Sequence, residues 1–127
     1  MPGLQAKKVL VPFDYSERCV NAVRRAVKIA ANDGQVIVLH AMMDFYPVHP
    51  AELFPDYSEE AQRRVAEVKM RDMLATADID LDKVELVFAV GDAGIEVTEH
   101  AKEQAIDLIV VPSHGRRGVQ RLSLIHI

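Results

Sequence analysis

Four short runs of consecutive aliphatic and β-branched residues divide this chain, and they constrain its fold more than any other feature. The runs are KKVLVP (7–12), QVIVLHA (35–41), VELVFAV (84–90) and IDLIVVP (106–112). Apolar residues follow one another within each run instead of alternating with polar ones, which is typical of strands covered on both faces. Such strands form parallel sheets between layers of helices. The runs therefore predict an α/β fold with a doubly wound parallel sheet.

The segments between these runs are of two kinds. Amphipathic spacing predicts helices over residues 16–32, 58–77 and 95–105, with Ser16 as the N-cap of the first. The connection over 42–57 instead carries three prolines and four aromatic residues. A connection of this length either lies over a ligand crevice or packs onto the domain through its aromatic side chains.

Length and composition exclude several classes of protein. A chain of 127 residues is expected to form one domain that folds on its own hydrophobic core. The formal net charge of −4 argues against a nucleic-acid partner, which would need a basic face. Residues 1–6 do not resemble a signal peptide, and no apolar run approaches the roughly 20 residues that span a bilayer, so we expect a cytoplasmic protein with no membrane partner. The single cysteine, Cys19, agrees with a reducing compartment.

A short polar loop follows the fourth run, within VVPSHGRRG (110–118). In open α/β sheets, ligands bind beyond the carboxyl ends of the strands, where such loops lie. Gly115 and Gly118 would let backbone amides approach an anion closely, and Arg116 and Arg117 add positive charge. The loop therefore indicates anion or phosphate binding. It fits equally a turn that needs glycine for its backbone and arginine for solubility.

Asp14 follows the first run by two residues and precedes the first expected helix. Its carboxylate can accept hydrogen bonds from a ribose hydroxyl or an adenine amino group, or it can stabilise the helix N-terminus. Two other doubly wound sites fit poorly. A phosphoacceptor receiver domain needs a pair of acids at this point, whereas Phe13 precedes Asp14. A flavodoxin-like site needs a loop rich in Ser, Thr and Gly, and FDYSERC offers only Ser16.

Residues that could bind a metal or act as nucleophiles form no recognisable set. The five histidines lack metal-ligand spacing, so we expect no metal site. They are His40, His49, His100, His114 and His126. Cys19 is expected to pack as a small side chain, although the helix N-terminus could lower its pKa. No Ser/His/Asp or Cys/His set, Walker A motif or GxGxxG motif occurs, so we expect a protein that is not an enzyme.

Three stretches together closely resemble the universal stress protein family: KKVLVPFDYSE, VIVLHA and VGDAGIEVTEHAKEQAIDLIVVPSHGRRG. The resemblance implies a single domain over residues 1–127, with a sheet in the order 3-2-1-4-5. ATP-binding members of the family hold adenine and ribose near the position of Asp14, and the phosphates on the loop after the fourth strand. The resemblance thus implies ATP with magnesium as the cofactor to test, and a small adenine nucleotide as the partner. The candidate nucleotide-binding residues are Pro12, Asp14, Ala41, Val111, Pro112, Ser113, His114, Gly115 and Arg116.

The phosphate loop departs from the family pattern, which reads Gly, two residues, Gly, nine residues, and Gly followed by Ser or Thr. The corresponding residues are Pro112, Gly115, Ile125 and His126, so only Gly115 matches. Proline removes an N–H that could face a phosphate, and Ile125 places a branched side chain where the backbone should approach the ligand. The loop is therefore expected to be a degraded ATP-binding element.

The C-terminal residues also leave the family pattern. SLIHI (123–127) has no helix start, which indicates a truncation or a foreign tail. We therefore expect the last helix and the fifth strand to be missing, which leaves the order 3-2-1-4 and an exposed edge at the fourth strand. The family homodimer, which in many members pairs through the fifth strand, is not expected. The interpretation is a stress-response protein that acts through association; the alternative is an adenine-nucleotide-binding switch.

Overall fold

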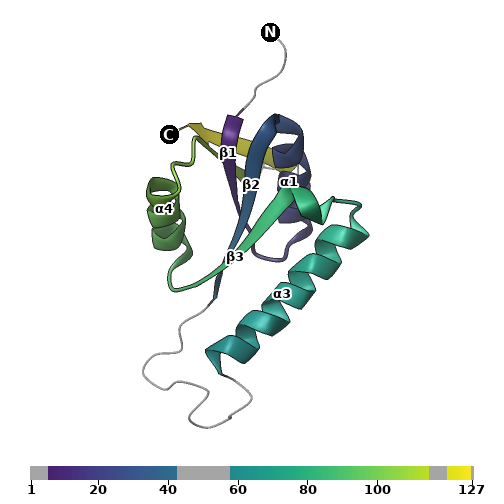
Figure 1. Ribbon diagram of the computed structural model, residues 1–127, viewed down its shortest axis with the longest axis vertical. Helices are drawn as coiled ribbons and strands as arrows, with labels where there is room; N and C mark the ends of the chain where they lie inside the picture. Colours follow the sequence, from purple (N-terminus) through teal and green to yellow (C-terminus); the bar gives the residue numbers. More distant parts are fainter. Residues whose placement is uncertain (1–5, 43–57, 115–119, 127) are drawn as a thin grey trace.

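The computed structural model describes residues 6–42, 58–114 and 120–126. One sheet runs through this part of the chain, with the strand order β3-β2-β1-β4-β5 (Figure 1). Its strands are β1 (Ala6–Pro12), β2 (Ala30–Met42), β3 (Val84–Val90), β4 (Leu108–His114) and β5 (Gln120–His126). The helical elements described are α1 (Glu17–Ile29), α3 (Glu59–Thr76), the 3-10 turn η2 (Leu81–Lys83) and α4 (Ala93–Glu103). None of these helices is long and apolar enough to cross a membrane.

Helices cover both faces of the sheet, and each face has its own apolar core. On the face of α1 and α3, the buried strand residues are Val9, Val11, Val36, Val38, Leu108 and Val110. On the face of α4, they are Leu10, Ile37, Leu39 and Ile109. Successive residues of one strand enter opposite cores, which explains why the apolar runs are continuous. The predicted doubly wound fold is confirmed, with β3, β2, β1 and β4 all parallel.

β5 stands where the sequence interpretation expected no strand. It pairs antiparallel with β4 along the full length of both, from Leu108 opposite His126 to His114 opposite Gln120. The expectation that β4 would be an open edge is therefore wrong. Only residues 115–119 separate the two strands. So short a connection allows an antiparallel hairpin, whereas a parallel strand needs a crossover of about a dozen residues or more.

α1 begins where the sequence predicts and ends earlier. Ser16 is its N-cap, and the Ser16 hydroxyl accepts a hydrogen bond from the Cys19 amide at 3.2 Å. The helix ends at Ile29 instead of residue 32, because Ala30 is already extended and pairs with Ala6 of β1. Pairing in the sheet thus overrides the helix propensity of alanine at this point.

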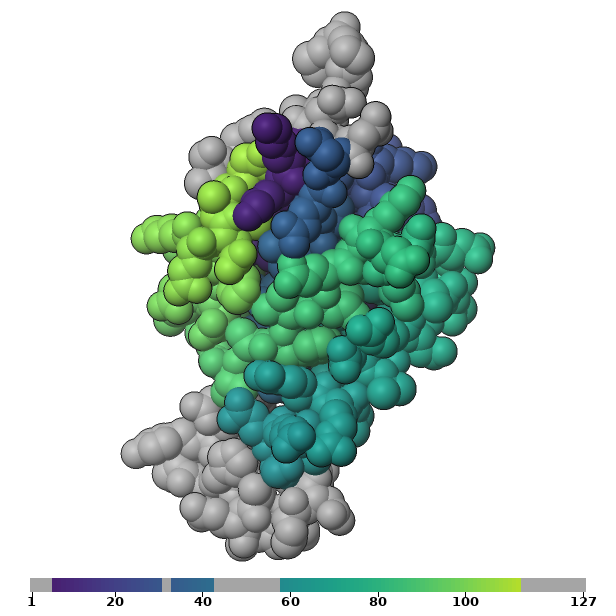
Figure 2. Space-filling model, in the orientation of Figure 1, coloured from purple at the N-terminus to yellow at the C-terminus, as the bar shows by residue number. Residues whose placement is uncertain are grey.

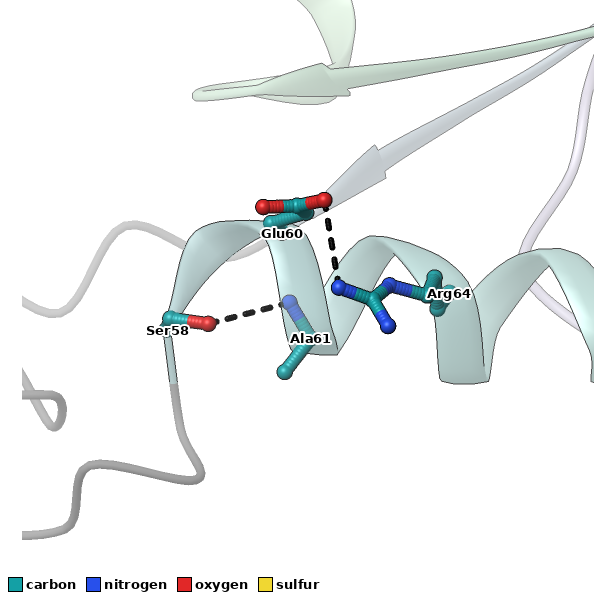
Figure 3. A network of polar contacts seen from close by, with 4 residues as sticks. All are labelled: Ser58, Glu60, Ala61 and Arg64. Atoms are coloured by element: carbon teal, nitrogen blue, oxygen red, sulfur yellow. Dashed lines mark hydrogen bonds and ion pairs between the residues drawn. The ribbon is translucent and has the colours of Figure 1, made fainter.

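The N-terminus of α3 is stabilised by contacts within the helix itself (Figure 3). The Ser58 hydroxyl caps the helix by accepting a hydrogen bond from the Ala61 amide at 3.1 Å. One turn on, Arg64 donates to the carboxylate of Glu60 at 3.1 Å, in an exposed i,i+4 pair. These contacts favour helix formation without attaching the helix to the sheet.

The buried residues of α3 are Met70 and Leu74, and both lie in its second half. Nearer the N-terminus of the helix, Val65 and Val68 are 69% and 68% exposed. The space-filling view shows α3 (teal) continuing the surface formed by β3 and η2 (green) (Figure 2). α3 is thus packed onto the domain more tightly by its C-terminal half than by its N-terminal half.

Asp107 joins the start of β1 to the start of β4. Its carboxylate accepts hydrogen bonds from the amides of Lys7 and Lys8, at 3.0 and 3.1 Å. Its own amide donates to the Lys8 carbonyl at 3.1 Å. The ladder between these strands is short, with Val9 opposite Leu108 as its first pair, so Asp107 extends the connection toward the amino ends of the strands.

We predict that Asp107→Ala lowers the free energy of unfolding by about 1–3 kcal/mol, because it leaves two backbone donors at the β1–β4 junction without their acceptor. Urea denaturation of the two proteins measures the difference. Asp72→Ala, at an exposed position of α3, is the matched control and should leave the free energy of unfolding within about 0.5 kcal/mol. Equal effects of the two substitutions would contradict the role assigned to Asp107.

Candidate functional site

A cavity of about 270 Å³ opens at the carboxyl ends of β1, β2 and β4. It is lined by Pro12, Phe13, Asp14, Cys19, Leu39, His40, Ala41, Ala93, Val97, Val111 and Pro112. β1 lies between β2 and β4. The chain adds β2 and β3 on one side of β1 and then β4 on the other side, so the direction of strand order switches at β1. Such a switch point is where open α/β sheets bind ligands.

The structure brings five of the nine sequence-predicted site residues together around this cavity. They are Pro12, Asp14, Ala41, Val111 and Pro112. Ser113 and His114 are the last two residues of β4. Gly115 and Arg116 lie outside the described residues, as does the 43–57 part of the long connection. That these residues bind a nucleotide stays a prediction.

Asp14 stands at the exposed rim of the cavity and is held by the start of α1. One carboxylate oxygen, Oδ1, accepts hydrogen bonds from the Ser16 amide at 2.9 Å and from the Cys19 thiol at 3.0 Å. Partial burial raises the pKa of Asp14, but the hydrogen bonds from Ser16 and Cys19 and the charge of Arg18 outweigh it and lower the pKa to about 2. The residue is therefore ionised at neutral pH, and it serves the start of the helix while facing the cavity.

Cys19 packs in the apolar core between α1 and the sheet, as the sequence predicts. The sequence did not predict its hydrogen bond to Asp14. Burial raises the pKa of the Cys19 thiol, outweighing the opposing effect of its hydrogen bonds with Ser16 and the Asp14 backbone. The thiol therefore stays protonated at neutral pH and remains a donor to the carboxylate.

His40 is a packed side chain of the cavity wall. Its Nδ1 lies 2.8 Å from the carbonyl oxygen of Phe13, and its ring meets the ring of Tyr15 edge to face at 4.6 Å between centroids. Its ring lies 6.4 Å from that of Phe88 on β3. These contacts fix the imidazole between β1 and β3. Across the described residues, no three His, Cys, Asp or Glu side chains are grouped so as to hold a metal ion.

Sequence reasoning missed the part of the wall that comes from α4. Asp92 is the N-cap of this helix, because its carboxylate accepts a hydrogen bond from the Ile95 amide at 3.0 Å, so α4 starts two residues earlier than predicted. The first turns of the helix then place Ala93 and Val97 against the cavity. The available signal was Asp92 itself, a good N-cap directly after the third strand.

The described lining of the cavity is mostly apolar, and Asp14 gives it a negative charge. Apart from Asp14 and His40, the described lining residues are aliphatic, aromatic, proline or cysteine, and none of them is Lys or Arg. Such a pocket suits a flat apolar group, with a hydrogen-bond donor that reaches the carboxylate at the rim.

Comparison with known proteins identifies the family of this chain. The model of the universal stress protein family matches residues 5–126. The chain belongs to the universal stress protein family. It is 31% identical to universal stress protein A homolog 2 of Coxiella burnetii, over 91% of this chain and 81% of that protein.

Solved structures of the family share the fold. The universal stress protein UspA from Lactobacillus plantarum is 26% identical, with a TM-score of 0.62, over 86% of this chain and 78% of that one. A second universal stress protein is 23% identical, with a TM-score of 0.50, over 82% of this chain and 70% of that one.

We predict that the stabilising effect of Asp14 disappears in acid. Its pKa falls from the ordinary 3.8 to about 2 on folding, so the ionised group stabilises the fold fully above about pH 4 and loses this effect as the pH falls toward 2. The difference in Tm between the wild type and Asp14→Asn should be constant from pH 7 to pH 5 and shrink below pH 4. Thermal denaturation followed by circular dichroism measures it, and a difference that persists to pH 2 would contradict the prediction.

Proposed function

We propose that this universal stress protein binds an adenine nucleotide chiefly through its nucleoside end, in the cavity at the switch point of the sheet. The observation that carries the proposal is the lining: apolar walls from three strands and α4, with the ionised Asp14 at the rim. The walls fit the faces of a purine, and the carboxylate can accept hydrogen bonds from ribose hydroxyls or from the adenine amino group. Membership of the family supports a role in the stress response.

One structural relative is a complex of a universal stress protein with cAMP. At 23% identity this likeness extends to the fold, and the binding of cAMP is a property of that protein. For the present chain, the lining of its own cavity at the switch point supports the proposal.

The described residues of the proposed site offer fewer contacts to the phosphates of a nucleotide than to its nucleoside. Pro112 has no backbone N–H to offer, and the described lining contains no cationic side chain. Asp14 is the one carboxylate in that lining, which is too little to hold magnesium without the phosphates of the ligand. We infer that ATP with magnesium gains little over adenosine in this chain.

We predict that adenosine, AMP and ATP bind with dissociation constants within about tenfold of one another, since all three share the nucleoside end, and tenfold corresponds to about 1.4 kcal/mol. Asp14→Ala should weaken adenosine binding by about 10- to 100-fold, because a hydrogen bond to a charged group contributes about 1.5–3 kcal/mol. Calorimetric titration measures these constants, and Asp72→Ala on α3 should leave them unchanged. Equal affinity of the wild type and Asp14→Ala for adenosine would refute the proposal.

Pro112 is tested separately by comparing ligands. Pro112→Gly restores a backbone donor at the cavity, and we predict that it tightens ATP binding by about tenfold or more while leaving adenosine binding nearly unchanged. The ratio of the two affinities, measured by titration in the same buffer, removes any effect of glycine on the stability of the fold. If the ratio stays the same, the N–H at position 112 does not face the phosphates.

A second candidate function is association without nucleotide. The exposed Val65 and Val68 on α3 favour it, because paired apolar side chains on an outward helix face can contact another protein. Failure to bind adenosine, together with a mass in light scattering that rises with concentration, would support this candidate. In both candidates the protein is expected to be cytoplasmic and not an enzyme, and these two points stay predictions.

A further inference from the structure

Tyr15, directly after Asp14, has a backbone conformation that residues other than glycine rarely adopt. Its φ is +66°, in the left-handed region. The Cβ atom makes this conformation unfavourable, so it persists only where the surroundings enforce it. At Tyr15 it turns the chain from the end of β1 into the N-cap of α1, with Asp14 on the cavity side.

Aromatic neighbours enforce this conformation from the sheet side. The Tyr15 ring meets Phe13 edge to face at 5.2 Å between centroids, and His40 in the same geometry at 4.6 Å. Both residues also line the cavity. The ring is thus fixed to the wall of the proposed ligand site.

α3 holds the same side chain from the other side. The Tyr15 hydroxyl donates a hydrogen bond to the carbonyl of Ala66 at 2.7 Å, and the ammonium of Lys69 lies 4.8 Å from the ring centroid. Burial raises the pKa of Tyr15 to about 12, so its hydroxyl remains a donor at neutral pH. Ala66 lies near the middle of α3, between the exposed Val65 and Val68 in the sequence.

We propose that Tyr15 is a positioning residue through which the middle of α3, at Ala66 and Lys69, holds Asp14 at the rim of the cavity. Occupancy of the cavity and attachment of α3 are then coupled, and the coupling is reciprocal: a ligand on Asp14 strengthens the attachment of α3, and loss of the attachment weakens the ligand. The coupling to a ligand rests on the proposed function. The positioning of Asp14 does not.

The first experiment needs no ligand. Tyr15→Phe keeps the ring and removes only the hydrogen bond to Ala66. In this variant, hydrogen exchange of the amides over residues 62–68 should become faster, and the titration midpoint of the Asp14 carboxyl, followed by NMR, should move from its wild-type value. Arg64→Ala is the matched control, because it removes the exposed pair with Glu60 in the same half of the helix (Figure 3). It should speed exchange locally without moving the Asp14 midpoint.

The second experiment uses adenosine as the probe. Adenosine should slow exchange over residues 62–68 in the wild type but not in Tyr15→Phe, and Tyr15→Phe should bind adenosine about three- to tenfold more weakly. Tyr15→Gly, which adopts a positive φ without strain, should fold and should bind more weakly still, because it lacks both the ring and the hydroxyl. Arg64→Ala should bind like the wild type.

The outcomes separate the two proposals. If the wild type does not bind adenosine, the proposed function fails, and the Asp14 midpoint alone decides whether Tyr15 positions the carboxylate. If adenosine binds, but Tyr15→Phe matches the wild type in affinity, exchange and Asp14 midpoint, the positioning role of Tyr15 is overturned.

Discussion

The central position of β1 is the constraint on which the rest of the structure depends. It pairs in parallel with β2 on one side and β4 on the other, and its residues Val9, Leu10 and Val11 have no solvent exposure. Burying an aliphatic side chain contributes about 1.5–3 kcal/mol, and these three serve both cores. Because the chain leaves β1 at the point where the sheet order reverses, the same strand also opens the cavity at its carboxyl end.

The stability of this core offsets two unfavourable features of the site. Turning the chain at Tyr15 requires an unfavourable backbone conformation, and holding Asp14 ionised requires hydrogen bonds that outweigh its partial desolvation. Ser16 and Cys19 supply those hydrogen bonds from α1, while Phe13 and His40 surround the ring of Tyr15. A rigid parallel sheet with buried strands can support such a turn, since its strand ends do not move independently.

The strands β1 to β4 and the starts of α1 and α3 could be predicted from sequence because each depends on local pattern. Continuous apolar runs define β1 to β4, Ser16 caps α1 as expected, and α3 begins at its N-cap Ser58, where the helix over 58–77 was expected to start. The early end of α1 at Ala30 could not be predicted, because it depends on pairing with β1. β5 was not predicted, because the family pattern has a helix before its fifth strand and these residues show no helix start, whereas β5 pairs antiparallel with β4 directly. The left-handed Tyr15 follows from contacts with His40 and α3, which lie far from it in sequence.

The two ends of the proposed nucleotide site depend on different parts of the sheet, so a change at one end can leave the other unaltered. β1, the turn after it, β2 and α4 line the proposed nucleoside end, through Pro12, Asp14, His40, Ala41, Ala93 and Val97. The proposed phosphate end follows β4, where Pro112 pairs with Leu122 of β5. A change in this hairpin alters neither the turn at Tyr15 nor the hydrogen bonds that hold Asp14, because these come from α1, α3 and the wall formed by His40. The geometry around Asp14, on which the proposed nucleoside binding depends, is therefore independent of the departure of the phosphate loop from the family pattern.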